Sequence, residues 1–192
     1  DRRRYFLMTQ IWIALVASLL SLTIFLDLLS PGLLLVLVFC STFCRYCTRS
    51  RVVGHGAIYP SRSRLERAIE YIRSTPTVRD VLISGGDPLS LSDARLTALV
   101  AALEAIPQLT TLRLHSRTVL AIPDRVTPAL IDLLAGTRLN VVLVTHSNHE
   151  REISAEVAAA LARLRAARVT LLNQSVLLAQ VNDDAATIAA HC

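Results

Sequence analysis

The feature that most constrains the fold of this chain is a repeated alternation between short apolar runs and longer segments of helical periodicity. Five apolar runs are candidate strands, at residues 33–39, 81–83, 112–114, 141–144 and 169–172. Segments with apolar residues at helical spacing separate them, such as Leu96, Leu99 and Leu103. Repeats of this kind are typical of parallel βα units joined by right-handed crossovers. We therefore predict an α/β fold, a partial (βα) TIM-like barrel with its helices outside.

Capping residues mark where four of the predicted helices begin. A serine, threonine or aspartate before a helix can accept a hydrogen bond from the first turn, and proline fits the first helical position. The candidates are Ser92, Thr127 followed by Pro128, Ser154, and either Asp183 or Asp184. The loops that follow the strands in such a fold gather at one edge of the sheet. Polar motifs follow every predicted strand, so we expect them to converge there.

Three of the four cysteines lie close together after the first predicted strand. Cys40, Cys44 and Cys47 occupy the run Cys-Ser-Thr-Phe-Cys-Arg-Tyr-Cys, whereas Cys192 ends the sequence. This spacing can wrap one loop around a cubane iron–sulfur cluster and leave the fourth iron without a protein ligand. Such an iron is open to chemistry. The spacing therefore favours a reactive [4Fe-4S] cluster over a fully ligated electron carrier.

Two other uses of the cysteines fit the pattern less well. Zinc sites usually combine two CxxC units or add histidines at short spacing, and here His55 accompanies a single CxxC. Disulfide pairing would leave one of the three cysteines over, and nothing else in the chain is typical of a secreted disulfide scaffold. The sequence therefore favours a reducing compartment, and we expect a cytoplasmic location.

Five motifs occur in this order along the chain: Cys-Arg-Tyr-Cys-Thr-Arg (44–49), Asp-Val-Leu-Ile-Ser-Gly-Gly-Asp-Pro-Leu (80–89), Leu-His-Ser-Arg (114–117), Thr-His-Ser-Asn-His (145–149) and Leu-Asn-Gln-Ser-Val-Leu-Leu (172–178). In these motifs the chain resembles the lysine 2,3-aminomutase family of radical S-adenosylmethionine (SAM) enzymes, over about residues 40–184. That family includes the aminomutase branch that β-lysylates elongation factor P. Leu-His-Ser-Arg is more similar to that branch, and Cys-Thr-Arg-Ser-Arg to the enzymes that act on free amino acids.

The resemblance implies a barrel of the radical SAM type and a role for residues at its strand ends. Cys40, Cys44 and Cys47 would bind the [4Fe-4S] cluster, and Arg49 would contact the α-carboxylate of the substrate. The residues expected to bind a cofactor are Tyr46, Gly85, Gly86, Asp87, Ser116, Arg117, His146 and Gln174. Glycines allow close backbone approach, and an arginine can hold a carboxylate through charge-assisted bonds. No residue is assigned a catalytic role.

The function implied by the resemblance is that of a radical SAM isomerase. The reduced cluster would cleave SAM to a 5′-deoxyadenosyl radical, which starts the migration of an amino group from the α to the β carbon of lysine or a similar amino acid. The expected partners are this amino acid and an electron donor such as flavodoxin or ferredoxin, and a homo-oligomer is left open. The alternatives are the β-lysylation aminomutase for elongation factor P and a non-catalytic, membrane-tethered protein that binds an iron–sulfur cluster or a cofactor.

Pyridoxal phosphate is a further cofactor of the family, attached to a lysine downstream of the Asn-Gln-Ser motif. This chain contains no lysine. We therefore expect residues 33–192 to be a radical SAM barrel truncated at its C-terminus. The formal net charge is +5, but the arginines are spread along the chain, so nucleic-acid binding is not expected.

The N-terminal segment, residues 1–32, is apolar and unlike the rest of the chain. Residues 11–29 are almost wholly apolar over a length that spans a bilayer, and three arginines precede them at residues 2–4. Read alone, this pattern predicts a transmembrane helix that would tether the protein to the membrane. A corrupted or out-of-frame sequence is the main alternative, and a buried helix of a soluble protein is the third.

Overall fold

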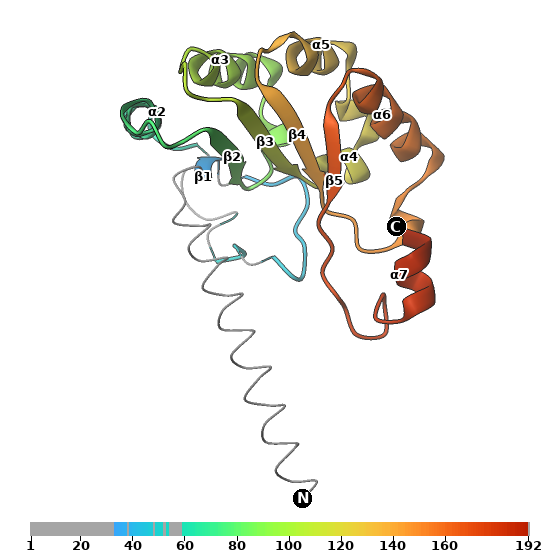
Figure 1. The fold of residues 1–192 in the computed structure, drawn as a ribbon. Helices are drawn as coiled ribbons and strands as arrows, with labels where there is room; N and C mark the ends of the chain where they lie inside the picture. Colours follow the sequence, from blue (N-terminus) through green and yellow to red (C-terminus); the bar gives the residue numbers. More distant parts are fainter. Residues whose placement is uncertain (1–32, 38, 48, 52, 54–58, 192) are drawn as a thin grey trace, which may run out of the picture.

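The computed structural model describes residues 33–37, 39–47, 49–51, 53 and 59–191. Five strands form one sheet in the order β1-β2-β3-β4-β5, and every neighbouring pair is parallel (Figure 1). The strands are β1 (Leu33–Leu37), β2 (Asp80–Gly85), β3 (Thr111–Ser116), β4 (Asn140–Thr145) and β5 (Thr170–Asn173). The predicted α/β class and parallel sheet are confirmed, and the arrangement is consistent with a partial radical SAM barrel.

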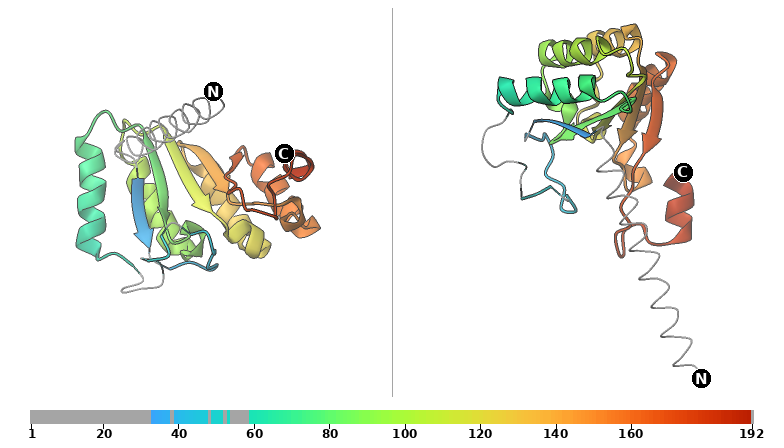
Figure 2. Two further views of the ribbon diagram at one scale, coloured as in Figure 1. Left: turned by 90° about the horizontal axis from the view of Figure 1, so that it is seen from below. Right: turned by 60° about the vertical axis from the view of Figure 1, so that its left-hand side comes forward.

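Helices connect the strands and extend to both edges of the sheet. Those described are α2 (Arg62–Ser74), α3 (Asp93–Glu104), α4 (Thr118–Ala121), α5 (Pro128–Gly136), α6 (Ala155–Ala166) and α7 (Ala185–His191), with 3₁₀ turns η1 (Pro88–Ser90), η2 (Pro123–Arg125) and η3 (Glu150–Glu152). Figure 2 shows α2 beside β1 at one edge and α6 with α7 at the other. The short helix α4 and the 3₁₀ turns were not predicted from the sequence.

The core lies between the sheet and helices α3, α5 and α6. Because side chains alternate along a strand, Leu112 and Leu114 of β3 are fully buried on the helix side. Leu103, Leu130 and Leu164 meet them from the three helices, again fully buried. The alternate side chains of β3, among them that of His115, are only half buried and belong to the other face. That face contributes to the site described below.

The predicted helix starts are largely confirmed. Thr127 accepts from the Leu130 amide at 3.2 Å, and Ser154 accepts from the Val157 amide at 3.3 Å. Ser92 is the residue before α3, as predicted, but its side chain makes no capping bond. Of the two aspartates proposed for the last helix, Asp184 caps it, with Oδ1 2.9 Å from the Thr187 amide.

The apolar N-terminal segment, residues 1–32, lies outside the described residues, as does His55. Within the part of the chain that the structure describes, no helix is both long and apolar enough to span a bilayer. The transmembrane helix at residues 11–29 and the division at residue 32 therefore stay predictions.

Candidate active site at the carboxyl ends of the strands

The loops that follow the five strands leave the same edge of the sheet, because the strands are parallel. In Figure 1 the loops after β1, β4 and β5 all lie below the sheet, on the side opposite α3 and α5. The convergence expected from the sequence is therefore present. The contacts between these loops define what the site can do.

Two glycines at the end of β2 bring the cysteine loop against the sheet. Gly85 has a φ of 128°, a conformation that favours glycine. A Cβ on Gly86 would lie 1.8 Å from the carbonyl oxygen of Phe39, so only glycine fits there. The amide of Asp87 also donates to the Phe39 carbonyl at 3.1 Å. The backbone just before Cys40 therefore lies directly against the two glycines, which leave room for this close approach.

The carboxylate of Asp87 ties the end of β2 to the start of α4. It is 2% exposed. Its Oδ1 accepts from the Leu89 amide at 3.0 Å and the Ser116 hydroxyl at 2.7 Å. Its Oδ2 accepts from the amides of Arg117 at 2.7 Å and Thr118 at 2.9 Å. Four donors satisfy both oxygens, which stabilises the charge of a buried carboxylate.

Arg117, the residue before α4, joins three loops through its guanidinium. It donates to the Tyr46 hydroxyl in the cysteine loop and to the main-chain carbonyl of His146 after β4. It also pairs with the carboxylate of Glu152 in η3. The side chains of Arg117 and Glu152 are 22% and 24% exposed, so the pair is mostly shielded from water. Sequence reasoning missed Glu152, although it lies three residues beyond the histidine motif.

Arg49 lies against the end of β2. Its Nη1 donates to the Ser84 hydroxyl at 2.7 Å and to the Gly85 carbonyl at 3.3 Å. Burial lowers the pKa of the Arg49 guanidinium, while the neighbouring Cys47 opposes that shift. Arg49 therefore brings a positive charge between the cysteine loop and the glycine turn.

His115 and His146 form a pair inside the site. Nε2 of His146 lies 3.4 Å from Nδ1 of His115, and the rings meet edge to face with centroids 5.5 Å apart. Burial, followed by the neighbouring His146 and nearby positive charges, lowers the pKa of His115 to about 4, whereas a hydrogen bond to Gln174 opposes the shift. Burial also lowers the pKa of His146. Both imidazoles are therefore neutral at pH 7.

The three clustered thiols are unpaired and half buried. Burial raises the pKa of Cys40, and a hydrogen bond from Thr42 opposes the shift. Among the described residues, no three histidine, cysteine or acidic side chains are close enough to hold one metal ion. Three thiols in one loop are nevertheless the donors that an iron–sulfur cluster takes when one iron is left open. The residues present fit such a cluster.

Pyridoxal phosphate does not fit the residues present. Its usual attachment is a lysine side chain, and the chain contains none.

Asparagine side chains hold the loop after β5 onto the loop after β4. Oδ1 of Asn173 accepts from the Ser147 amide at 2.9 Å. The Asn148 Oδ1 accepts from the Val176 amide at 2.7 Å, and the Asn182 amide donates to the Asn148 carbonyl at the same distance. Asn148 and Asn182 are buried, and sequence reasoning did not single them out. The two residues contact each other across 34 positions of the sequence, so no local signal marks this contact.

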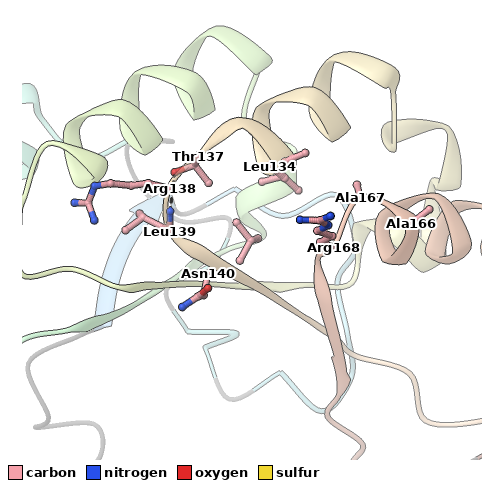
Figure 3. A pocket seen from close by; sticks show the side chains of 10 residues that line it. Leu134, Thr137, Arg138, Leu139, Asn140, Ala166, Ala167 and Arg168 are labelled. Carbon is pink, nitrogen blue, oxygen red and sulfur yellow. Dashed lines mark hydrogen bonds between the residues drawn. The ribbon is translucent and has the colours of Figure 1, made fainter.

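Two hollows flank these contacts. One of about 390 Å³ is lined by the end of β5, the loops after β4 and β5, and α7, including Asn148, Asn173 and His191. The other, of about 450 Å³, lies at the opposite end of β4 and β5, beside Arg138 and Arg168 (Figure 3). None of the predicted site residues lines this second hollow, so it is separate from the candidate site.

Most of the predicted residues meet one another in the structure. The connected members are Tyr46, Arg49, Gly85, Asp87, Ser116, Arg117, His146 and Gln174. Gln174 is exposed but reaches His115. His149, by contrast, is used within its own loop, where Nδ1 accepts from the Arg151 amide at 3.1 Å. The cofactor and substrate roles of these residues stay predictions.

Residues 34–190 match the radical SAM superfamily. L-lysine 2,3-aminomutase of Escherichia coli (strain K12) is 43% identical over 158 residues, which are 82% of this chain and 46% of that relative. The L-lysine 2,3-aminomutase of Clostridium subterminale is 46% identical over 79% of this chain and 36% of its own length. Glutamate 2,3-aminomutase of Clostridioides difficile is 37% identical over 76% of this chain and 34% of its own length. The chain thus spans less than half the length of the curated relatives it matches.

Proposed function

Because the chain belongs to the radical SAM superfamily, we propose that its described residues form the cluster-binding and SAM-binding part of an amino acid 2,3-aminomutase. The observation that supports this most directly is the contact between the cysteine loop and the ends of β3 and β4. Arg117 joins Tyr46 to the carbonyl of His146. This contact brings a cysteine loop, an arginine and two histidines to one edge of a parallel sheet, where ligands of α/β folds bind.

In this proposal Cys40, Cys44 and Cys47 hold a [4Fe-4S] cluster. Such a cluster, when reduced, supplies the electron that cleaves SAM to methionine and a 5′-deoxyadenosyl radical. The protein holds the loop against Gly86, through the backbone contact with Phe39. The donor, such as flavodoxin or ferredoxin, and a homo-oligomeric state are proposals as well. So is a cytoplasmic location, which a loop of three free thiols favours.

The SAM site is proposed to lie between the cysteine loop and the strand ends, bounded by Tyr46, Gly85, Gly86, Asp87, Ser116, Arg117, His146 and Gln174. Asp87 serves this site by positioning, because four internal donors already occupy its carboxylate. The neutral imidazoles of His115 and His146 can both donate and accept hydrogen bonds. They add no charge that would repel a sulfonium.

Arg49 is proposed to bind the α-carboxylate of the amino acid. The hydrogen bonds that it makes to Ser84 and Gly85 use Nη1. Within the described residues, its Nε and Nη2 donate no hydrogen bond, so a planar pair of donors remains for a carboxylate. Lysine and glutamate, the substrates in the relatives' names, share that group. The substrate proposed is therefore lysine or a similar amino acid.

The proposal is tested by cofactor cleavage. Protein reconstituted anaerobically with iron and sulfide is incubated with SAM and dithionite, and 5′-deoxyadenosine is measured by mass spectrometry. We expect the nucleoside from the wild type and none from Cys44→Ala. Equal amounts from the two proteins would show that the cleavage is not catalysed at the cysteine loop, and the proposal would fail.

A further inference from the structure

We propose that Glu152 is a positioning residue for the cysteine loop, and that it acts through Arg117. The reason for such positioning rests on the proposed function, since a loop that binds a cluster must hold its thiols in place. Neither the spacing of the cysteines nor any motif in the sequence points to this glutamate. The contacts of its two carboxylate oxygens do.

Each oxygen of Glu152 has its own donor. Oε2 pairs with Nη2 of Arg117, and Oε1 accepts from the Asn148 amide at 3.0 Å. The carboxylate therefore bridges the loop after β4 and the guanidinium at the end of β3. Because one carboxylate holds both, neither partner can shift without breaking a charge-assisted hydrogen bond.

Arg117 transmits this restraint to the cysteines. Its other terminal nitrogen, Nη1, donates to the hydroxyl of Tyr46, which lies between Cys44 and Cys47. The guanidinium carbon also lies 5.7 Å from the centre of the Tyr46 ring, within reach of a cation–π contact. A planar guanidinium has a fixed fork of donors. When Glu152 holds Nη2 of Arg117 in place, the direction in which Nη1 of the same guanidinium points toward the Tyr46 hydroxyl is therefore fixed as well.

Charge gives a second reason for Glu152. The Arg117 side chain is 22% exposed, so its positive charge is only weakly screened by water. Asp87 is close, but its carboxylate accepts from main-chain amides and from Ser116 rather than from the guanidinium. Among the described residues, Glu152 is the acid that pairs with Arg117. Without it, a partly buried cation would stand unpaired beside the cysteine loop, which is unfavourable.

The first test uses the protein without a cluster. Cysteine alkylation is followed residue by residue by mass spectrometry in the wild type, Glu152→Gln, Glu152→Asp and Glu150→Gln. Glu150 is exposed and begins the same 3₁₀ turn, so its variant is the matched control. We expect Cys44 and Cys47 to react about threefold faster or more in Glu152→Gln, because local opening governs access, with partial rescue in Glu152→Asp. Urea midpoints measured in parallel separate local release from general unfolding.

Wild-type rates in Glu152→Gln, or equal acceleration in Glu150→Gln, would overturn the inference. Faster alkylation that a lower urea midpoint explains completely would overturn it as well, because an ion pair that only stabilises the fold predicts that result.

The second test measures the midpoint potential of the reconstituted cluster. An unpaired cation nearby favours the reduced, more negative cluster, so Glu152→Gln should shift the potential upward and Arg117→Gln downward. The double variant should return it toward the wild-type value. An unchanged potential in Glu152→Gln would refute the charge role. If the wild type binds no cluster, the proposed function fails, while the alkylation rates still decide whether Glu152 positions the loop.

Discussion

Two arginines at opposite ends of the sheet show how differently the two ends are built. Arg138, just before β4, donates to the carbonyls of Glu104, Ile106 and Leu109 at 3.0, 2.7 and 2.8 Å. All three acceptors are main-chain groups at and beyond the end of α3. Arg117, just after β3, contacts one carbonyl and two side chains from separate loops.

The amino end of the sheet supports the fold, whereas the carboxyl end forms the candidate site. At the amino end of the strands, an arginine donates to carbonyls at and beyond the end of a helix, which stabilises a connection. At the carboxyl end, side chains contact one another, and several have shifted pKa values, among them Cys40, Tyr46 and His115. Clusters of this kind are typical of functional sites. Substitutions at the amino end should therefore change stability alone.

The largest effect is expected at the cysteine loop. Replacing Cys40, Cys44 or Cys47 with alanine should abolish formation of the [4Fe-4S] cluster, because each would supply the ligand of one iron. Iron and sulfide content and the visible absorption spectrum measure this loss. Cys192→Ala is the matched control and should retain the cluster. A full cluster in Cys44→Ala would show that the loop is not its binding site.

Asp87→Asn should give the largest loss of stability at the carboxyl end. The amide group that replaces one oxygen would face N–H donors instead of accepting from them. We expect a loss of about 2–4 kcal/mol in the free energy of unfolding, since buried donors would be left without partners. Urea denaturation measures it. Asp132→Asn, on an exposed position of α5, should stay within about 0.5 kcal/mol of the wild type, and equal losses in both would refute the role given to Asp87.

Arg138→Ala tests the amino end. Loss of its bonds to three carbonyls should lower the free energy of unfolding by about 1–2 kcal/mol, the lower part of the usual range because the residue is exposed. The same urea titrations measure it, and cluster content per folded protein should be unchanged. A specific loss of cluster would break the distinction between the two ends.

His115 should make stability depend on pH at the carboxyl end. Its pKa is about 4 in the folded protein and near 6.5 in the unfolded chain, so the unfolded chain binds more protons between these values. The free energy of unfolding should therefore fall as the pH drops from 6.5 to 4, by roughly 1–2 kcal/mol after allowance for solvent screening. Urea titrations at several pH values should show this slope reduced in His115→Gln. An equal slope in both proteins would contradict the assignment.

The smallest effect is expected at Arg168, beside the hollow at the amino end. It follows α6 with φ 64°, and the Val169 amide bonds back to the Leu164 carbonyl at 3.1 Å, the arrangement in which glycine is preferred. Arg168→Gly should raise the free energy of unfolding by about 0.5 kcal/mol. Thermal melts measure the change. A clear destabilisation would mean that the arginine side chain makes a contact that outweighs its strained backbone.

Local patterns in the sequence were enough to predict the strands and most helix starts, and the resemblance to the aminomutase family pointed to the individual residues that gather at the site. They failed where a distant residue decides the structure. Helix α4 begins where Asp87, about thirty positions earlier in the chain, accepts from the Thr118 amide. Glu152 and Asn182 likewise act on partners in other loops. Periodicity and capping rules describe neighbours in sequence, so contacts between loops leave no mark in them.

The central claim is that the cysteine loop binds a cluster which reacts with SAM. Its most direct test is the EPR spectrum of the anaerobically reconstituted, dithionite-reduced protein, recorded with and without SAM. The account predicts the signal of a reduced four-iron cluster that changes when SAM is added, because SAM would bind the iron that lacks a protein ligand. A protein that forms no such cluster, or one whose cluster signal is identical with and without SAM, would contradict the account.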